Sequence, residues 1–174
     1  PRGICTEAWI MDHKEILQNL QKAYVEAGSQ IVYAPTFGGN RYSLGLHGLQ
    51  DKLVEMNHAL VNISREAVGH KVYVAGDITT TGKMMEPAGD LTYEMAYETY
   101  CEQIKVLEDA GVDLIVAETM INIEETLAAL DAAASVSSLP VMCTMTVEAD
   151  GSIFSGGNAV EAAIALEGAG AAAV

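Results

Sequence analysis

Two carboxylates follow apolar runs that are typical of buried strands. Glu118 comes directly after the run at residues 114–117, and Asp77 comes shortly after the run at residues 71–75. In α/β proteins, ligands bind at the carboxyl ends of parallel strands, because the strand fixes a side chain that the following loop leaves open. Glu118 is therefore a candidate binding residue, with a local cap or ion pair as the alternative explanation for its position.

Cysteine and histidine spacing gives no metal-binding motif within the chain. Cys5, Cys101 and Cys143 are far apart and match no C-x-x-C or zinc-finger pattern. Their odd number indicates free thiols, and Cys101 and Cys143 fall in helical and strand patterns as small core residues. No H-x-H or H-E-x-x-H set is formed by the four histidines, His13, His47, His58 and His70.

The segments that must position these side chains alternate between strand and helix patterns. Strands are predicted at residues 31–34, 71–75, 114–117 and 140–145, and the start of a fifth at 171–174. Helical patterns fill the intervals between the strands, as parallel pairing requires. The sequence thus predicts a parallel β/α array, either an open doubly wound sheet or part of a (βα)8 barrel.

Helix-starting sequences support this order of elements. Asp12, Asn122 and Asn158 are each followed three residues later by glutamate, the pattern of a capping box. The first box predicts a helix that ends at Gly28, after a lead-in loop at residues 1–11. Further helices are predicted near residues 49–67 and 92–109. Apolar side chains recur at helical spacing in these three segments: Ile16, Leu20, Tyr24 and Ala27; Leu53, Met56, Leu60 and Ile63; Ala96, Tyr100, Ile104 and Leu107.

Long loops follow the first two predicted strands. Residues 36–43 and 76–89 carry glycines but match neither the G-x-G-x-x-G dinucleotide fingerprint nor the G-x-x-x-x-G-K-[ST] phosphate loop. Loops of this length at strand ends are usually retained for binding. The even repeat and these loops favour the barrel. Because a complete barrel needs about 250 residues, the chain of 174 would form about two thirds of one.

The charge of the chain limits its classes of partner. Nine lysines and arginines oppose 24 aspartates and glutamates, which gives a formal net charge of −15. Nucleic acid and anionic membrane surfaces would be repelled. No apolar run reaches membrane-spanning length and no signal-peptide pattern opens the chain, so we expect a cytoplasmic protein. A start at Pro1 and an unfinished strand at residues 171–174 indicate part of a longer protein.

Four motifs occur in order along nearly the whole chain. They are Thr36-Phe-Gly-Gly-Asn-Arg41 after a strand, Gly82-Lys83 before Gly89-Asp-Leu-Thr92, Gly111-Val-Asp113 before Glu118-Thr-Met120, and Met145-Thr146 before Asp150-Gly151. Together they resemble the homocysteine S-methyltransferase family, which includes the homocysteine-binding module of cobalamin-dependent methionine synthase and the betaine-dependent enzymes.

The resemblance implies a (βα)8 TIM barrel, present in residues 1–174 as a partial barrel of about four to five βα units. It implies homocysteine as the substrate and a zinc ion held by three cysteine thiolates, which would favour the nucleophilic thiolate of the substrate. By the same resemblance Glu118 would bind the substrate's ammonium group. Thr36 and Phe37 would line the amino-acid pocket, and Asp77 adds a second carboxylate there.

The chain also departs from the family pattern. The family's first strand would precede Pro1, and its zinc cysteines are expected beyond Val174, so no metal ligand is assigned among Cys5, Cys101 and Cys143. Many relatives have asparagine at the position of Pro35, and a serine is common at the position of Asp77.

Three functions agree with these features. The first is zinc-dependent methyl transfer to homocysteine to give methionine, with methylcobalamin or methyltetrahydrofolate upstream and corrinoid and folate domains as partners. The second is a related thiol methyltransferase that uses betaine or S-methylmethionine. The third is a non-catalytic fragment or binding module, because the zinc ligands are outside the chain.

Overall fold

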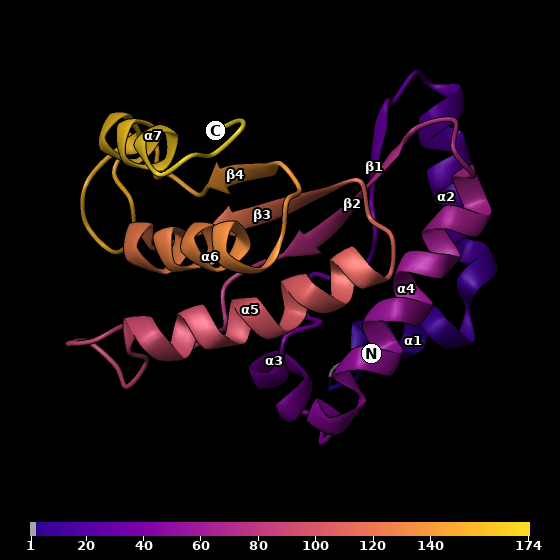
Figure 1. Cartoon of the computed structure of the whole chain (residues 1–174), viewed down its shortest axis with the longest axis horizontal. Helices are drawn as coiled ribbons and strands as arrows, with labels where there is room; N and C mark the ends of the chain where they lie inside the picture. Colours follow the sequence, from indigo (N-terminus) through magenta and orange to yellow (C-terminus); the bar gives the residue numbers. More distant parts are fainter. Residues whose placement is uncertain (1–2) are drawn as a thin grey trace.

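A parallel sheet runs through the centre of the protein, whose structure is a computed structural model that describes residues 3–174 (Figure 1). Its strands are β1 (Ile31–Tyr33), β2 (Tyr73–Ile78), β3 (Leu114–Met120) and β4 (Val141–Met145), in the order β1-β2-β3-β4. Ala173 forms a further parallel bridge to Met142, so the predicted fifth strand begins beside β4. The predicted parallel β/α array is confirmed.

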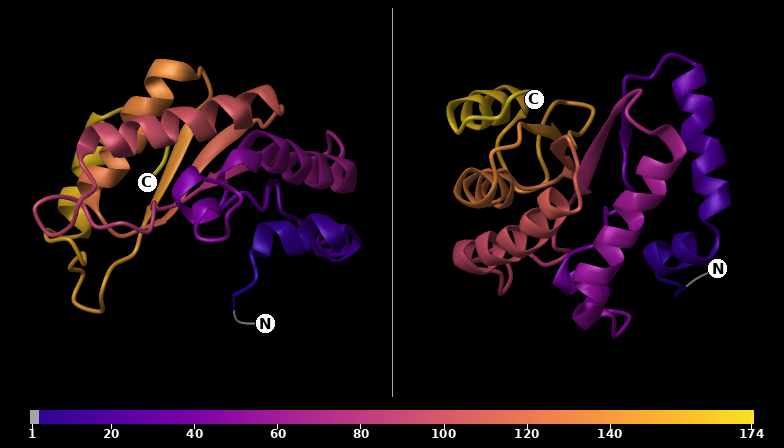
Figure 2. Two further views of the ribbon diagram at one scale, coloured as in Figure 1. Left: turned by 90° about the horizontal axis from the view of Figure 1, so that it is seen from below. Right: turned by 45° about the vertical axis from the view of Figure 1, so that its right-hand side comes forward.

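Helices connect the strands and surround the sheet. They are α1 (Thr6–Asp12), α2 (Lys14–Glu26), α3 (Arg41–Gly45), the 3-10 turn η1 (Gln50–Lys52), α4 (Leu53–Val68), α5 (Tyr93–Asp109), α6 (Ile123–Val136) and α7 (Ala159–Gly168). Figures 1 and 2 show them following one another around the sheet, from α2 at one end to α7 at the other. This is the arrangement of an arc of a (βα)8 barrel.

The two faces of the sheet have different neighbours. On the outer face, strand residues such as Val74, Ile115 and Cys143 pack with helical residues in the main core. On the inner face a smaller apolar cluster contains Ala75 and Val116. Because successive side chains of a strand point to opposite faces, the residues two positions further along, Asp77 and Glu118, also lie on the inner face.

The predicted inward stripes of α4 and α5 are confirmed. Met56 and Ile63 of α4 are buried, and Tyr100, Ile104 and Leu107 of α5 have no exposed surface. Tyr100, Ile104 and Leu107 pack with strand residues in the main core, whereas Met56 packs in a separate apolar cluster with Leu53. Burial of this apolar surface stabilises the fold.

The three predicted capping boxes have three different outcomes. Asn158 and Glu161 form a complete box at the start of α7. Asn122 accepts from the backbone N–H of Glu125 at 3.0 Å, but the Glu125 carboxylate binds elsewhere. The box expected at Asp12 is wrong, because Asp12 is the last residue of α1, and α2 begins after His13 without a side-chain cap.

The predicted lead-in loop is also wrong over residues 6–11, which belong to α1. Ala8 and Met11 on this helix pack against an apolar cluster that contains Leu53 and Met56 of α4. The helix is therefore stabilised by a contact some 45 residues along the chain, which local sequence does not reveal. The Trp9 and His13 rings stack at its end, with centroids 4.3 Å apart.

Helix α2 packs through a different stripe from the apolar one seen in the sequence. Its buried residue is Gln21, whose amide donates to the carbonyl of Tyr33 and to the hydroxyl of Ser64, both at 2.9 Å. Ile16 and Leu20 are each 52% exposed. The side of α2 that carries Gln21 therefore faces the protein, and the apolar stripe lies on the exposed side. Within the described residues no helix is long and apolar enough to cross a membrane.

Candidate functional site

The side chains of Asp77 and Glu118 meet on the inner face of the sheet near the carboxyl ends of β2 and β3. Asp77 is 5% exposed, and Glu118 is half-buried. Burial, the charge of Glu118 and a side-chain hydrogen bond with Glu118 raise the pKa of Asp77 to about 8. One oxygen of Asp77, Oδ1, is buried without a hydrogen-bond partner. The pair thus offers acceptor atoms to a positively charged ligand.

Two threonine hydroxyls fix the backbone under these carboxyls. Thr36 is fully buried, and its Oγ1 donates to the carbonyl of Asp77 at 2.8 Å and accepts from the Asp77 N–H at 3.0 Å. Oγ1 of Thr79 donates to the carbonyl of Glu118 at 2.8 Å. These bonds tie the ends of β1, β2 and β3 to one another, so the two carboxyls are held by rigid elements.

A bulge follows Glu118 directly. Pairing of β3 with β4 shifts between Ala117 and Met120, and Thr119 has a left-handed φ of 57°. The Thr119 N–H donates to Oγ1 of Thr144 at 2.9 Å, which satisfies a donor that the irregular ladder leaves free. Bulges next to binding sites redirect side chains, and here the bulge terminates the regular strand at Glu118.

Tyr33 is the third titratable side chain on this face. Burial, followed by the charges of Glu118 and Asp77, raises the pKa of its hydroxyl. The group therefore remains neutral at physiological pH and can donate a hydrogen bond. Tyr33 was not predicted as a site residue, although it lies in the predicted strand at residues 31–34.

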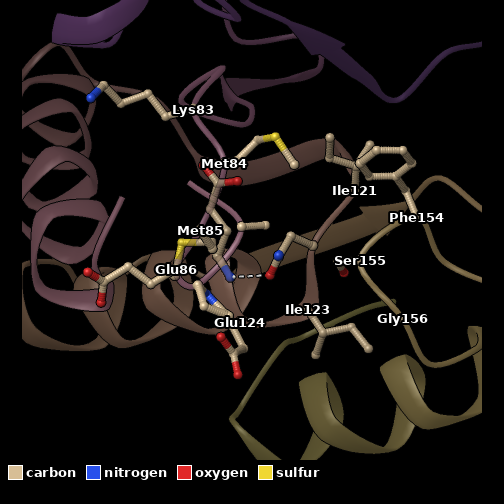
Figure 3. Close-up of a pocket in the computed structure, with 14 residues that line it drawn as sticks. Lys83, Met84, Met85, Glu86, Ile121, Ile123, Glu124, Phe154, Ser155 and Gly156 are labelled. Atoms are coloured by element: carbon tan, nitrogen blue, oxygen red, sulfur yellow. Dashed lines mark hydrogen bonds between the residues drawn. The ribbon is translucent and has the colours of Figure 1, made fainter. Parts of the chain in front are cut away.

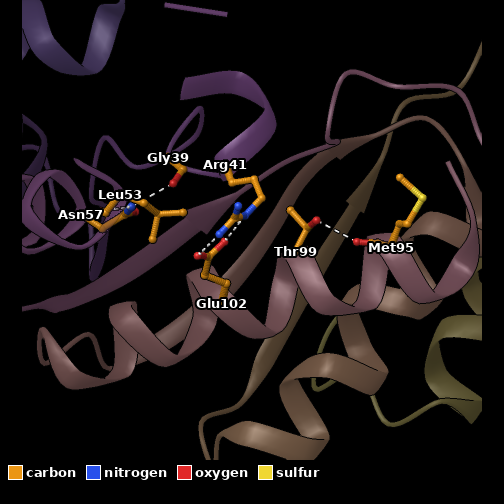
Figure 4. A network of polar contacts seen from close by, with 7 residues as sticks. All are labelled: Gly39, Arg41, Leu53, Asn57, Met95, Thr99 and Glu102. Carbon is orange, nitrogen blue, oxygen red and sulfur yellow. Dashed lines mark hydrogen bonds and ion pairs between the residues drawn. The ribbon is translucent and has the colours of Figure 1, made fainter. Parts of the chain in front are cut away.

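A buried amide network holds the loop that carries Thr36 and Phe37. Nε2 of Gln103 donates to the Thr36 carbonyl at 2.9 Å, and Nδ2 of Asn57 donates to the Gly39 carbonyl at 2.9 Å. Figure 4 shows the Asn57 contact beside the ion pair of Arg41 and Glu102. A Cβ at Gly39 would come within 2.8 Å of the Gln103 amide, so the close approach requires glycine there.

Phe37 lies on this loop and is 40% exposed. The N–H of the next residue, Gly38, donates to Oε1 of Glu7 at 2.9 Å and so anchors the loop. Of the four predicted site residues, Thr36 bonds to the backbone of Asp77, and the side chains of Asp77 and Glu118 lie on the same face of neighbouring strands. Phe37 lies on the adjoining loop with its ring accessible.

A buried glutamate supports the loop after β2. Glu125 is 1% exposed, and its Oε1 accepts from the Thr81 N–H at 2.7 Å and from the Tyr100 hydroxyl at 3.0 Å. Neither Glu125 nor Gln103 was predicted as a supporting residue. Gln103 occupies the inward stripe of α5 between Tyr100 and Leu107, which is a signal that could have identified it.

A cavity of about 590 Å3 opens at the same end of the sheet, between the loops that follow β2, β3 and β4 (Figure 3). Its lining includes the apolar side chains of Met84, Ile121 and Phe154 and the carboxylates of Glu86 and Glu124. The edge of the sheet at the C-terminal ends of the strands therefore carries two features: the side chains of Asp77 and Glu118 on the inner face, and an apolar cavity between the loops.

Zinc has no set of ligands among the described residues. No group of three histidine, cysteine, aspartate or glutamate side chains is placed to hold a metal within residues 3–174. Cys143 is buried in the outer core, and burial raises the pKa of its thiol to about 11, which opposes thiolate formation. Cys5 is buried near α1, where its thiol donates to Glu7 Oε2 at 3.3 Å.

Comparison with known proteins gives consistent results. A model of the homocysteine S-methyltransferase family matches residues 2–174. Methionine synthases from Mycobacterium leprae and Mycobacterium tuberculosis are each 26% identical over 95% of the chain, which spans 15% of their length.

Among solved structures, the homocysteine methyltransferase MmuM from Escherichia coli is similar in fold. Its apo form has a TM-score of 0.73 at 19% identity, over 96% of this chain and 62% of that one. Its metallated form has a TM-score of 0.78 at 17% identity, over 96% and 66%. The predicted fold, part of a (βα)8 barrel, is confirmed.

Proposed function

The chain belongs to the homocysteine S-methyltransferase family, and we propose that it forms part of the homocysteine-binding barrel of a methionine synthase. The observation that carries this proposal is the carboxyl pair at the inner edge of the sheet, formed by Asp77 and Glu118. A free amino acid presents an ammonium group, and a carboxylate in a partly buried site is a strong partner for it.

In this proposal Glu118 is the acceptor for the ammonium group of homocysteine. It is the more accessible member of the pair, and Thr79 holds its backbone. Phe37, on the loop anchored by Glu7, would contact the aliphatic part of the substrate, and the buried Thr36 would hold the wall of the pocket from behind. These contacts orient the substrate before reaction, which lowers the entropic part of the barrier.

The chemical step would be a displacement at carbon. The thiolate sulfur of homocysteine forms a bond to the methyl carbon while the bond from that carbon to the donor breaks, and the product is methionine. The described residues contain no zinc site, so we assign activation of the thiol to zinc-binding cysteines expected beyond Val174. The residues of this chain bind the amino acid and fix its orientation.

The methyl donor is proposed from the relatives. The two methionine synthases match the chain over 95% of its length, which favours a corrinoid donor, with methyltetrahydrofolate as the source of the methyl group. Other parts of the same polypeptide or separate proteins would carry the corrinoid and folate. Betaine and S-methylmethionine are the alternative donors, as in related thiol methyltransferases.

The test is methyl transfer by the protein expressed from its complete reading frame. Homocysteine would be incubated in separate reactions with methylcobalamin, betaine and S-methylmethionine, and methionine would be quantified. Methionine from methylcobalamin alone supports the proposal, whereas methionine from one of the other donors reassigns the donor. No binding of homocysteine by the zinc-loaded protein would refute the proposed function.

A further inference from the structure

Asp77 and Glu118 lie on the same face of neighbouring strands, because the register pairs Asp77 with Val116, two residues before Glu118. Two ionised carboxylates on one face repel each other, so without a cation beside them one of the two favours its protonated form. Asp77 is the more buried of the two, and burial penalises its charged form. The proton of the empty site therefore lies on Asp77.

Residues 3–174 supply no cation that would allow both carboxyls to ionise. The five ion pairs in this part of the protein involve other acids: Glu66, Glu102, Asp109, Asp113 and Asp90. The Thr36 hydroxyl bonds to the backbone N–H and carbonyl of Asp77. The side-chain atom Oδ1 of Asp77 has no hydrogen-bond partner. A positively charged ligand would thus take the place that the proton holds in the empty site.

We propose that Asp77 makes binding of the substrate proton-linked: Asp77 releases its proton to solvent when the ammonium group binds Glu118. This inference rests on the proposed function, because it takes the ligand to be an amino acid. No covalent bond changes. The positive charge of the ammonium group replaces that of the proton. Asp77 does not contact the ligand but acts on it through Glu118, as a positioning residue.

The groups that face Asp77 agree with this exchange. From β3 the facing group is Glu118, and from β1 it is Tyr33, whose raised pKa keeps it neutral. The hydroxyls of Thr36 and Thr79 bond to backbone carbonyls and do not titrate in the physiological range. Since the pKa of Asp77 is about 8, the carboxyl is mainly protonated at pH 6.5, and the release is large enough to measure.

The experiment is titration calorimetry on the protein expressed from its complete reading frame, in two buffers with different ionisation enthalpies. Methionine is the probe, because the thiol of homocysteine could release a proton of its own. We expect about one proton released per methionine at pH 6.5 and progressively fewer as the pH passes 8, with affinity rising up to about tenfold per pH unit below that point. The ligand 4-(methylthio)butanoate, which lacks the ammonium group, is expected to release none.

Variants separate this exchange from a structural role of Asp77. Asp77→Asn and Asp77→Ser are expected to bind methionine without proton release and with no pH dependence between pH 6 and 8. Glu26→Gln, exposed at the end of α2, is the matched control and should behave as the wild type. If Asp77→Asn does not fold, Asp77→Ser and the wild-type titration still decide the question.

Two further outcomes would overturn the inference, and they are distinguishable. Methionine binding by the wild type without proton release, or an unchanged release in Asp77→Asn, would refute proton linkage while the proposed function stands. Failure of the zinc-loaded wild type to bind either methionine or homocysteine at any pH would refute both.

Discussion

The hydroxyl group of Thr36 bridges the two backbone polar groups of Asp77, accepting from its N–H at 3.0 Å and donating to its carbonyl at 2.8 Å. The family resemblance predicted Thr36 as a lining residue of the amino-acid pocket. In the structure its hydroxyl is committed to the neighbouring strand, and the side chain has no exposed surface. Thr36 thereby couples the loop after β1 to the carboxyl pair.

Replacement of Thr36 by valine tests this coupling. Thr36→Val has nearly the same volume but leaves the N–H and carbonyl of Asp77 without their side-chain partner. We expect the free energy of unfolding to fall by about 1–3 kcal/mol, the usual cost of a buried polar group without a partner. Urea unfolding would measure it. Thr36→Ser retains the hydroxyl and should lose less, so equal losses in both variants would contradict the coupling.

Substitution of Glu118 tests the ammonium contact. Glu118→Gln keeps the size of the side chain and removes its charge. We expect homocysteine affinity in the full-length protein to weaken by about 2 kcal/mol or more, through loss of a charge-assisted hydrogen bond. Calorimetry would measure the change, with Glu26→Gln as control. An unchanged dissociation constant for Glu118→Gln would remove Glu118 from the site.

The raised pKa of Asp77 predicts a pH-dependent stability. Its folded-state pKa of about 8 lies above the ordinary value of 3.8, so between these values the folded protein binds more protons than the unfolded chain. Stability from this group is therefore complete at low pH and is lost as the pH rises from about 4 through 8, by up to about 1.4 kcal/mol per pH unit.

Asp77→Asn should lack this loss. We expect the variant to gain stability relative to the wild type as the pH rises from 5 to 8, measured by urea unfolding at several pH values. Parallel stability curves for the two proteins would show that the pKa of Asp77 is not raised in the folded state.

Replacement by alanine should change the stability of the fold at one glycine of the segment after β1 and leave it nearly unchanged at another. A Cβ at Gly39 would come within 2.8 Å of the Gln103 amide and of the Thr36 carbonyl, inside a buried network. We expect Gly39→Ala to destabilise the fold by about 1–3 kcal/mol through overpacking. At Gly45 the nearest atom is 4.0 Å away, so Gly45→Ala should be nearly neutral in thermal unfolding. Similar losses at both sites would refute the packing argument.

The exposed apolar stripe of α2 predicts self-association of the 174-residue chain when it is expressed alone. Ile16, Leu20 and Tyr24 are 52%, 52% and 56% exposed, and Val160 and Ile164 of α7 are 68% and 66% exposed. Apolar surface of this kind and open sheet edges favour association. Light scattering after size exclusion would detect it, and polar replacements of the three α2 residues should reduce it. A monodisperse monomer with a sharp cooperative melt would contradict this prediction.

The order of elements and the core-facing stripes were predictable from the sequence. Apolar runs of strand length, helical spacing in α4 and α5, and the cap residues Thr92 and Asn158 act locally, so their physical effect is visible in neighbouring residues. The position of Glu118 near the carboxyl end of β3 followed from the same patterns, although β3 continues to Met120 through a bulge.

Tertiary contacts decided the remaining features. Helix α1 forms because it packs on α4, α2 turns according to the hydrogen bonds of Gln21, and the Glu125 carboxylate leaves its capping position to bind the Thr81 N–H. Each of these depends on partners distant in sequence, whose proximity no local pattern encodes.

The sequence by itself determined that this protein is a parallel β/α array with carboxylates at the ends of two strands, because strand and helix periodicity are local properties of the chain. Only the tertiary structure decided that Asp77 and Glu118 lie side by side on the inner face, since that depends on the register of β2 and β3, which pairs Asp77 with Val116. Burial of Asp77, and after it the charge of Glu118, raises the pKa of Asp77.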